Sequence, residues 1–234
     1  GKGRLVAGGH KQSFNVLKVS STICKFESIL LLLNIACFMN WKIQVIDIAG
    51  AYLHANLDNE VYMWLDKITT EALIEIDNSY KQYQNKNDQV LVKLDKALYG
   101  LHESSLCWYK HLVTTLKGLN YKISSYDASI GLIKDDNDKL IGFVALHVDD
   151  ILSSGTPKIM NELSNGLRIQ YKKIELQSGN EINYLGMKIE YKNGIIKLNQ
   201  KGYLNEIINI NSYKSDEIFQ IPYAHDIFVP ENHG

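Results

Sequence analysis

The sequence predicts an α+β fold, with antiparallel strands in a sheet and helices on one face of it. Residues 42 to 47 alternate polar and apolar side chains, which is the two-residue period of a half-buried strand. Residues 128 to 147 and 182 to 198 each contain apolar runs around a turn rich in Asp, Asn or Gly, as antiparallel hairpins do. Residues 104 to 116 place apolar side chains on one helical stripe. Strands and helices that do not alternate regularly favour α+β over α/β.

The first third of the chain is expected to contain a short strand at residues 4 to 7, an apolar helix at 26 to 40 and a strand that ends on Asp47. Residues 69 to 88 are polar and rich in Asn, Gln, Lys and Tyr. That composition indicates an excursion outside the core.

Two helices are expected in the second half. The helix at 104 to 116 has Ser104 or Ser105 available to cap its start. A helix at 157 to 170 has Thr156 at the N-cap position and proline at its first helical position, where the missing N–H costs nothing.

The composition excludes several classes of protein. A chain of 234 residues that is 45% hydrophobic and 22% charged is typical of one large or two small folded domains. The longest apolar run, residues 29 to 39, is shorter than the roughly 20 residues that cross a bilayer, and no secretory signal pattern is present. Three cysteines without metal-finger spacing fit an intracellular compartment. The first residue, Gly1, suggests a piece of a longer protein.

Charge is distributed unevenly, although the net charge is only −1. Residues 1 to 26 contain five basic side chains and no acidic one. This segment suits contact with a phosphate backbone, and it equally suits a solvated basic edge.

Two adjacent acids, Asp149 and Asp150, stand in the strongly apolar stretch 141 to 152. Two interpretations remain open on local sequence: a hairpin turn, where Asp is common, or a divalent cation site that relieves the repulsion between the carboxylates. If the strand ending on Asp47 is a neighbour, its carboxylate converges on the same point. Two cations about 3.5 to 4 Å apart would then suit phosphoryl transfer.

Five motifs, taken in order, resemble copia-type reverse transcriptases of LTR retrotransposons. They are Lys2-Gly-Arg4-Leu-Val-Ala-Gly-Gly-His-Lys-Gln, Asp47-Ile-Ala-Gly-Ala-Tyr52-Leu-His, Val92-Lys-Leu-Asp-Lys-Ala-Leu-Tyr99-Gly100-Leu with Trp108-Tyr109, His147-Val-Asp149-Asp150, and Tyr184-Leu-Gly186-Met. Each motif alone is weak, whereas the ordered set covers nearly the whole chain and is specific.

The resemblance implies a right-hand polymerase, with fingers and palm over residues 1 to about 190 and the start of a thumb or connection over about 191 to 234. The RNase H, integrase and protease regions of a Gag-Pol polyprotein would lie outside this sequence. The implied activity is DNA synthesis directed by an RNA or DNA template, from deoxynucleoside triphosphates and with two Mg²⁺ ions, or Mn²⁺ in their place. The implied partners are a template-primer and, through self-association or contact, other polyprotein domains.

The resemblance also implies roles for single residues. Asp47, Asp149 and Asp150 would be the catalytic, metal-binding carboxylates, with the carbonyl of Ile48 as a further ligand. Tyr52 would lie under the nucleotide sugar and exclude a 2′-hydroxyl, although a core aromatic next to a helix start is the alternative.

The remaining roles concern the nucleotide and the primer. Lys2 and Arg4 match the residues that grip the triphosphate. Glu103 stands where many copia-type enzymes have a glutamine that steadies the nucleotide, and Gly186 corresponds to the hairpin that holds the primer end. An acid beside a triphosphate weakens binding unless a metal or base offsets it.

Two alternative functions remain open. A decayed or co-opted fragment would fold and bind nucleic acid without polymerising. An unrelated metal-dependent phosphohydrolase would need none of the motifs around Tyr52, Tyr99 and Trp108.

Overall fold

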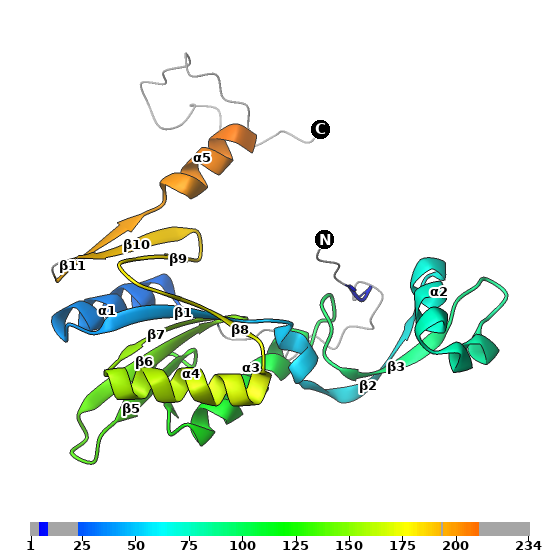
Figure 1. Ribbon diagram of the computed structural model, residues 1–234, viewed down its shortest axis with the longest axis horizontal. Helices are drawn as coiled ribbons and strands as arrows, with labels where there is room; N and C mark the ends of the chain where they lie inside the picture. The colour runs from blue at the N-terminus through cyan, green and yellow to red at the C-terminus, as the bar shows by residue number, and fades with distance from the viewer. Residues whose placement is uncertain (1–4, 9–22, 193, 211–234) are drawn as a thin grey trace, which may run out of the picture.

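The structure is a computed structural model, and it describes residues 5–8, 23–192 and 194–210. Its centre is a six-stranded sheet in the order β4-β5-β6-β7-β1-β8, in which every neighbouring pair is antiparallel (Figure 1). The strands are β1 (Lys42–Ile48), β4 (Lys122–Ile123), β5 (Ile130–Lys134), β6 (Leu140–His147), β7 (Asp150–Gly155) and β8 (Ile174–Ser178). The predicted antiparallel sheet is confirmed.

Two long helices cover one face of this sheet, α3 (Ser104–Gly118) and α4 (Pro157–Tyr171). Their buried side chains, among them Trp108 and Leu167, form one cluster with Ile46, Ile48 and Ile151 of the sheet. Both helices were predicted, α3 from its apolar stripe and α4 from Thr156 at the N-cap position and the proline that follows it. The core on this face is therefore made by every second side chain along the strands, those that pack against α3 and α4.

The other face is covered by α1 (Phe26–Phe38) and a small sheet of β9 (Glu181–Tyr184), β10 (Met187–Lys192) and β11 (Ile195–Asn199). Leu33 of α1 and Ile189 of β10 share a second cluster with Phe143 and Leu152. The prediction of helices on one face only was wrong. The physical reason is that β6 and β7 are buried on both faces, as the runs of consecutive buried residues along them show, so each face needs a cover.

A hairpin of β2 (Asn56–Trp64) and β3 (Leu91–Lys96) extends away from the main sheet and carries α2 (Lys67–Ile76) and a 3₁₀ helix, η3 (Asn78–Tyr83) (Figure 1). Thr70 is the only buried residue of α2, and η3 has none. The predicted polar excursion is thus confirmed as lying outside the core, although most of it is helical.

Two local predictions were wrong. Residues 5–8 form no strand; Ala7 instead donates its amide to the Tyr99 carbonyl at 2.7 Å, while Arg4 lies outside the described residues. Ser104 does not cap α3, because its buried hydroxyl pairs with the backbone of Leu98, accepting from the amide at 3.0 Å and donating to the carbonyl at 2.6 Å. The N-cap position belongs to Glu103, without a side-chain bond to the helix.

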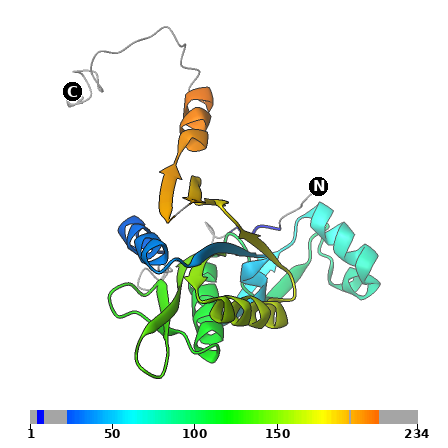
Figure 2. The same ribbon diagram turned by 60° about the vertical axis from the view of Figure 1, so that its left-hand side comes forward.

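The last described helix, α5 (Lys201–Ile210), follows β11 and projects away from the rest of the fold (Figures 1 and 2). None of the helices in the described ranges is long and apolar enough to cross a membrane.

Candidate active site

Strand pairing places a row of polar side chains across one end of the main sheet. Asp150 of β7 lies directly opposite Asp47 of β1 on one side and His147 of β6 on the other. Glu175 of β8 lies opposite Asp47 on its second side. Directly opposite residues of antiparallel strands point to the same face. Three carboxylates therefore share the face that α1 covers further along the strands. The pairing of β1 with β7 meets the condition under which Asp47 and Asp149 can converge.

The turn between β6 and β7 consists of Val148 and Asp149. Its geometry is unusual, because Val148 has a φ of +57°, a region that β-branched residues rarely adopt and that costs roughly 1–3 kcal/mol. Asp149 accepts a hydrogen bond at its carbonyl from the Ile48 amide at 3.3 Å. The turn is thus tied to the end of β1, and Asp149 is brought to Asp47.

A cavity of about 490 Å³ opens at this point. Asp47, Ile48, Asp149 and the two further charged residues Lys173 and Glu175 are among the residues that line it. The apolar part of its lining includes Leu5, Leu53 and Leu98, and the Tyr99 ring lies there too. Such a mixed cavity can hold a ligand with an apolar face and an anionic end.

Sequence reasoning did not identify Lys173 and Glu175. Glu175 is exposed and becomes a site residue only because β8 pairs with β1, which no local pattern indicates. Lys173 follows α4 and its carbonyl accepts from the Ala49 amide at 3.3 Å, which anchors this segment beside the end of β1.

Burial and neighbouring charges shift the pKa values of two residues of the site. Burial, then the charge of Asp149 and then that of Asp47, raise the pKa of Asp150 to about 6. Burial, Asp149 and Tyr99 together raise the pKa of Tyr52 above its ordinary value. Burial is the larger cause of both shifts, and the neighbouring negative charge of Asp149, which a cation would offset, adds to each.

The donor set fits magnesium bound together with a substrate. Within the described part of the chain, no group of three or more His, Cys, Asp or Glu side chains is arranged to hold a metal ion by itself. Mg²⁺, however, is usually bound through one or two carboxylates plus substrate phosphates and water. Asp47 and Asp149 line one cavity and offer such oxygens. Ile48, which follows Asp47 in the sequence, lines the same cavity.

The other predicted nucleotide-binding residues are dispersed. Tyr52, in the 3₁₀ helix η2 (Ala51–His54), is half-buried with its ring centroid 4.6 Å from that of Tyr99. Glu103 accepts from the Asn59 side chain at 2.9 Å and does not line the cavity. Lys2 and Arg4 lie outside the described residues.

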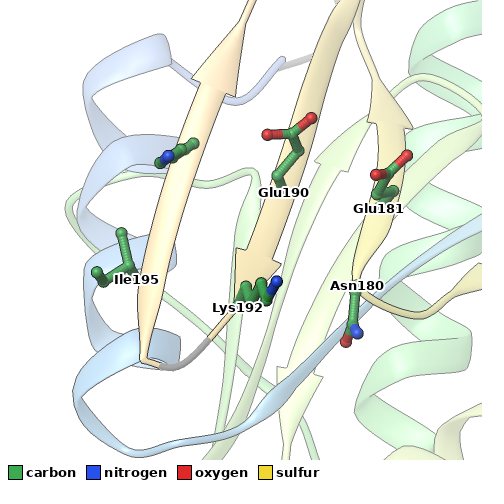
Figure 3. Close-up of a pocket in the computed structure, with 6 residues that line it drawn as sticks. Asn180, Glu181, Glu190, Lys192 and Ile195 are labelled. Atoms are coloured by element: carbon green, nitrogen blue, oxygen red, sulfur yellow. The ribbon is translucent and has the colours of Figure 1, made fainter.

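Gly186, the predicted primer-binding residue, forms the β9–β10 turn with Leu185. Both have positive φ, +74° and +49°, the pattern of a two-residue I′ turn, and Tyr184 and Met187 close it. The three-stranded sheet exposes a polar face with a hollow of about 410 Å³ (Figure 3). Its two glutamates, Glu181 and Glu190, both pair with Lys188, at 2.9 and 3.0 Å, so their charge is partly offset.

Both the sequence and the fold of this chain were compared with known proteins. The sequence profile described as "Reverse transcriptase (RNA-dependent DNA polymerase)" matches residues 1–224. The chain is 28% identical over 210 residues to the Retrovirus-related Pol polyprotein from transposon RE1 of Arabidopsis thaliana, covering 88% of this chain and 13% of that protein. It is 30% identical over 217 residues to the Transposon Ty1-DR5 Gag-Pol polyprotein of Saccharomyces cerevisiae, covering 88% and 11%.

A third relative, the Retrovirus-related Pol polyprotein from transposon TNT 1-94 of Nicotiana tabacum, is 25% identical over 228 residues, covering 95% of this chain and 16% of that protein. The chain thus spans 11 to 16% of the length of these three relatives. Among solved structures, a telomerase from Candida albicans superposes with a TM-score of 0.43 at 12% identity, covering 76% of this chain and 34% of that one.

The raised pKa of Asp150 predicts a pH dependence of the metal-free protein. Folding favours the protonated carboxyl, so this group's stabilising contribution is complete below its unfolded pKa near 4 and is lost as the pH rises through about 6. Asp150→Asn should remove that loss. In urea unfolding with EDTA, the free energy of unfolding of the wild type should fall relative to Asp150→Asn between pH 4 and pH 7.

The matched control is Asp136→Asn, which changes an exposed acid in the β5–β6 turn. Its stability should follow the wild type across the same pH range. Parallel curves for wild type and Asp150→Asn would contradict the charge accumulation at this site.

Proposed function

The chain belongs to the reverse transcriptase (RNA-dependent DNA polymerase) family, and from that premise we propose that it synthesises DNA on an RNA or DNA template by nucleotidyl transfer at the Asp47 and Asp149 cavity. The resemblance to copia-type retrotransposon Pol polyproteins is confirmed by the relatives. The observation that carries the proposal is that Asp47 and Asp149, far apart in sequence, line one cavity at the end of paired strands.

In this proposal the carboxylates of Asp47 and Asp149 hold two Mg²⁺ ions, or Mn²⁺ ions, and the Ile48 carbonyl contributes a further oxygen. When bound, the ions would lower the pKa of the primer hydroxyl and neutralise the leaving pyrophosphate. Asp150, directly opposite Asp47 in the pairing of β1 with β7, would support the two ligands and keep the local potential negative. Lys173 on the same cavity supplies a positive charge suited to a triphosphate.

The nucleotide would enter beside the two tyrosines. Tyr52 is proposed to lie under the sugar, since its ring contacts that of Tyr99, which lines the cavity. Burial and the charge of Asp149 both raise the pKa of its hydroxyl. Lys2 and Arg4 are proposed to bind the triphosphate, and Gly186 to hold the primer end. Residues 1 to about 190 would then be fingers and palm, with the thumb or connection beginning at about 191.

Glu103 is the weakest fit among the proposed nucleotide-binding residues. One carboxylate oxygen is occupied by Asn59, and the other is buried without a hydrogen-bond partner among the described residues. This favours a second candidate function, a folded relative that binds nucleic acid and no longer polymerises. A primer-extension assay distinguishes the two candidate functions, because only the first requires that nucleotides be added to the primer.

Removing one proposed metal ligand should abolish synthesis. Asp149→Asn keeps the shape of the side chain but loses the charge, so primer extension on an RNA template with Mg²⁺ should fall by roughly a hundredfold or more. Asp136→Asn, at the opposite end of the β6 strand, should extend as the wild type does. Equal extension by wild type and Asp149→Asn would show that the activity came from elsewhere.

The sugar-facing role of Tyr52 makes a prediction about selectivity. Tyr52→Val removes the bulk that would meet a 2′-hydroxyl, so the ratio of ribonucleotide to deoxynucleotide incorporation should rise by roughly tenfold or more. Tyr62→Val, an exposed tyrosine on β2, should leave the ratio unchanged. If the ratio stays constant in Tyr52→Val, the side chain is a core aromatic rather than a selectivity residue.

A further inference from the structure

Trp108 of α3 reaches the catalytic turn from beneath the sheet. Its side chain is 1% exposed, and its indole Nε1–H donates a hydrogen bond to the Val148 carbonyl at 2.6 Å. That carbonyl belongs to the peptide that joins Val148 to Asp149. The bond therefore acts on the one peptide unit that leads into the proposed metal ligand.

A central peptide in a turn of this kind can adopt two orientations. In a two-residue hairpin turn, types I′ and II′ differ by a flip of the central peptide, and only I′ needs a positive φ at both central residues. Here Val148 has a positive φ and Asp149 does not, which is the sign pattern of II′. Glycine usually occupies the first position of such a turn, so valine does not stabilise it by itself.

The indole is well placed to select one orientation. Its ring lies 5.9 Å from the His111 ring in a stacked arrangement and 5.4 Å from the Tyr171 ring in an edge contact. Tyr171 is fixed in turn by a hydroxyl contact of 2.9 Å with Thr115. A ring enclosed in this way has one rotamer available, so its N–H points at a fixed place.

The opposite side of the turn is held independently. The Asp149 carbonyl accepts from Ile48 of β1, so the peptide before Asp149 and the one after it are anchored to different elements. Release of the Trp108 bond would free the central peptide to flip while the β1 contact remained. The Asp149 residue, which lines one cavity with Asp47, would then change its orientation.

We propose that Trp108 is a positioning residue that holds the Val148–Asp149 peptide of the strained turn in the orientation that directs Asp149 into the cavity. This inference rests on the proposed function for its catalytic consequence, but the orientation of the peptide is a property of the fold alone. A residue that merely filled the core would act through its ring volume and not through its N–H.

The test compares Trp108→Phe with Tyr109→Phe by backbone NMR. Tyr109 is on the same helix and donates its hydroxyl to the Ala128 carbonyl at 2.7 Å, so its loss removes a comparable bond away from the turn. In Trp108→Phe the Asp149 amide should shift and show microsecond-to-millisecond exchange broadening, whereas in Tyr109→Phe it should match the wild type. An unchanged Asp149 amide in Trp108→Phe, or equal changes in both variants, would overturn the proposal.

A second substitution separates the N–H from the packing. Replacing Trp108 with β-(3-benzothienyl)alanine puts sulfur in place of the indole N–H and keeps the ring size, so it also serves if Trp108→Phe fails to fold. It should reproduce the Asp149 exchange. A wild-type spectrum at Asp149 in this protein would overturn the proposal.

Primer extension gives the catalytic readout. Because small displacements of a reacting group cost rate rather than binding, kcat should fall by roughly tenfold to a hundredfold in Trp108→Phe, with little change in KM for the nucleotide. Tyr109→Phe should keep both values. A positioning role would be contradicted if kcat fell and KM rose to the same extent in Trp108→Phe and in Tyr109→Phe. A wild type that extends no primer would count against the proposed function, while the amide comparison would still decide the role of Trp108.

Discussion

The pairing of β1 with β7 is the constraint on which the rest of the site depends. Six residue pairs, from Lys42 with Gly155 to Asp47 with Asp150, fix the register of these strands. A slip of one residue would turn every side chain to the other face, so Asp47 would enter the cluster that α3 and α4 form. Gln44 opposes that slip, because its buried side chain donates to the Ser164 hydroxyl of α4 at 3.3 Å and would have to leave this partner for the other face.

The same pairing brings negative charges together, which lowers the stability of the folded protein. Asp47, Asp150 and Glu175 lie side by side on one face, and the raised pKa of Asp150 records the repulsion and the loss of hydration there. A positive φ at Val148 adds local backbone strain. Proteins retain such features mainly where a function uses them, and the surrounding apolar core provides the stability that offsets them. A bound cation would attract each carboxylate and so offset the repulsion among them.

Much of this arrangement was predictable from sequence where the signal was local. The apolar run of α1, the alternation that ends at Asp47 and the proline at the start of α4 each indicated the element that the structure contains. The ordered motifs predicted the family because several segments had to agree at once. The convergence of Asp47 and Asp149 was conditional on neighbouring strands, and β1 and β7 are neighbours in the sheet.

What could not be predicted depends on tertiary contacts. Ser104 looked like a helix cap, but the loop at Leu98 competes for its hydroxyl. Glu175 joins the cavity through the pairing of β8 with β1, and Lys173 through the bond that its carbonyl accepts from Ala49. The second face of the sheet is covered because β10 packs on the same side as α1. The hydrophobic periodicity of α1 and that of β10 do not indicate this packing.

The most direct measurement of the central claim is a crystal structure with Mn²⁺ and a deoxynucleoside triphosphate, using anomalous scattering to locate the ions. Two manganese peaks about 3.5 to 4 Å apart, coordinated by the carboxylates of Asp47 and Asp149, are the predicted result. Manganese bound elsewhere, or none at this cavity with nucleotide present, would contradict it.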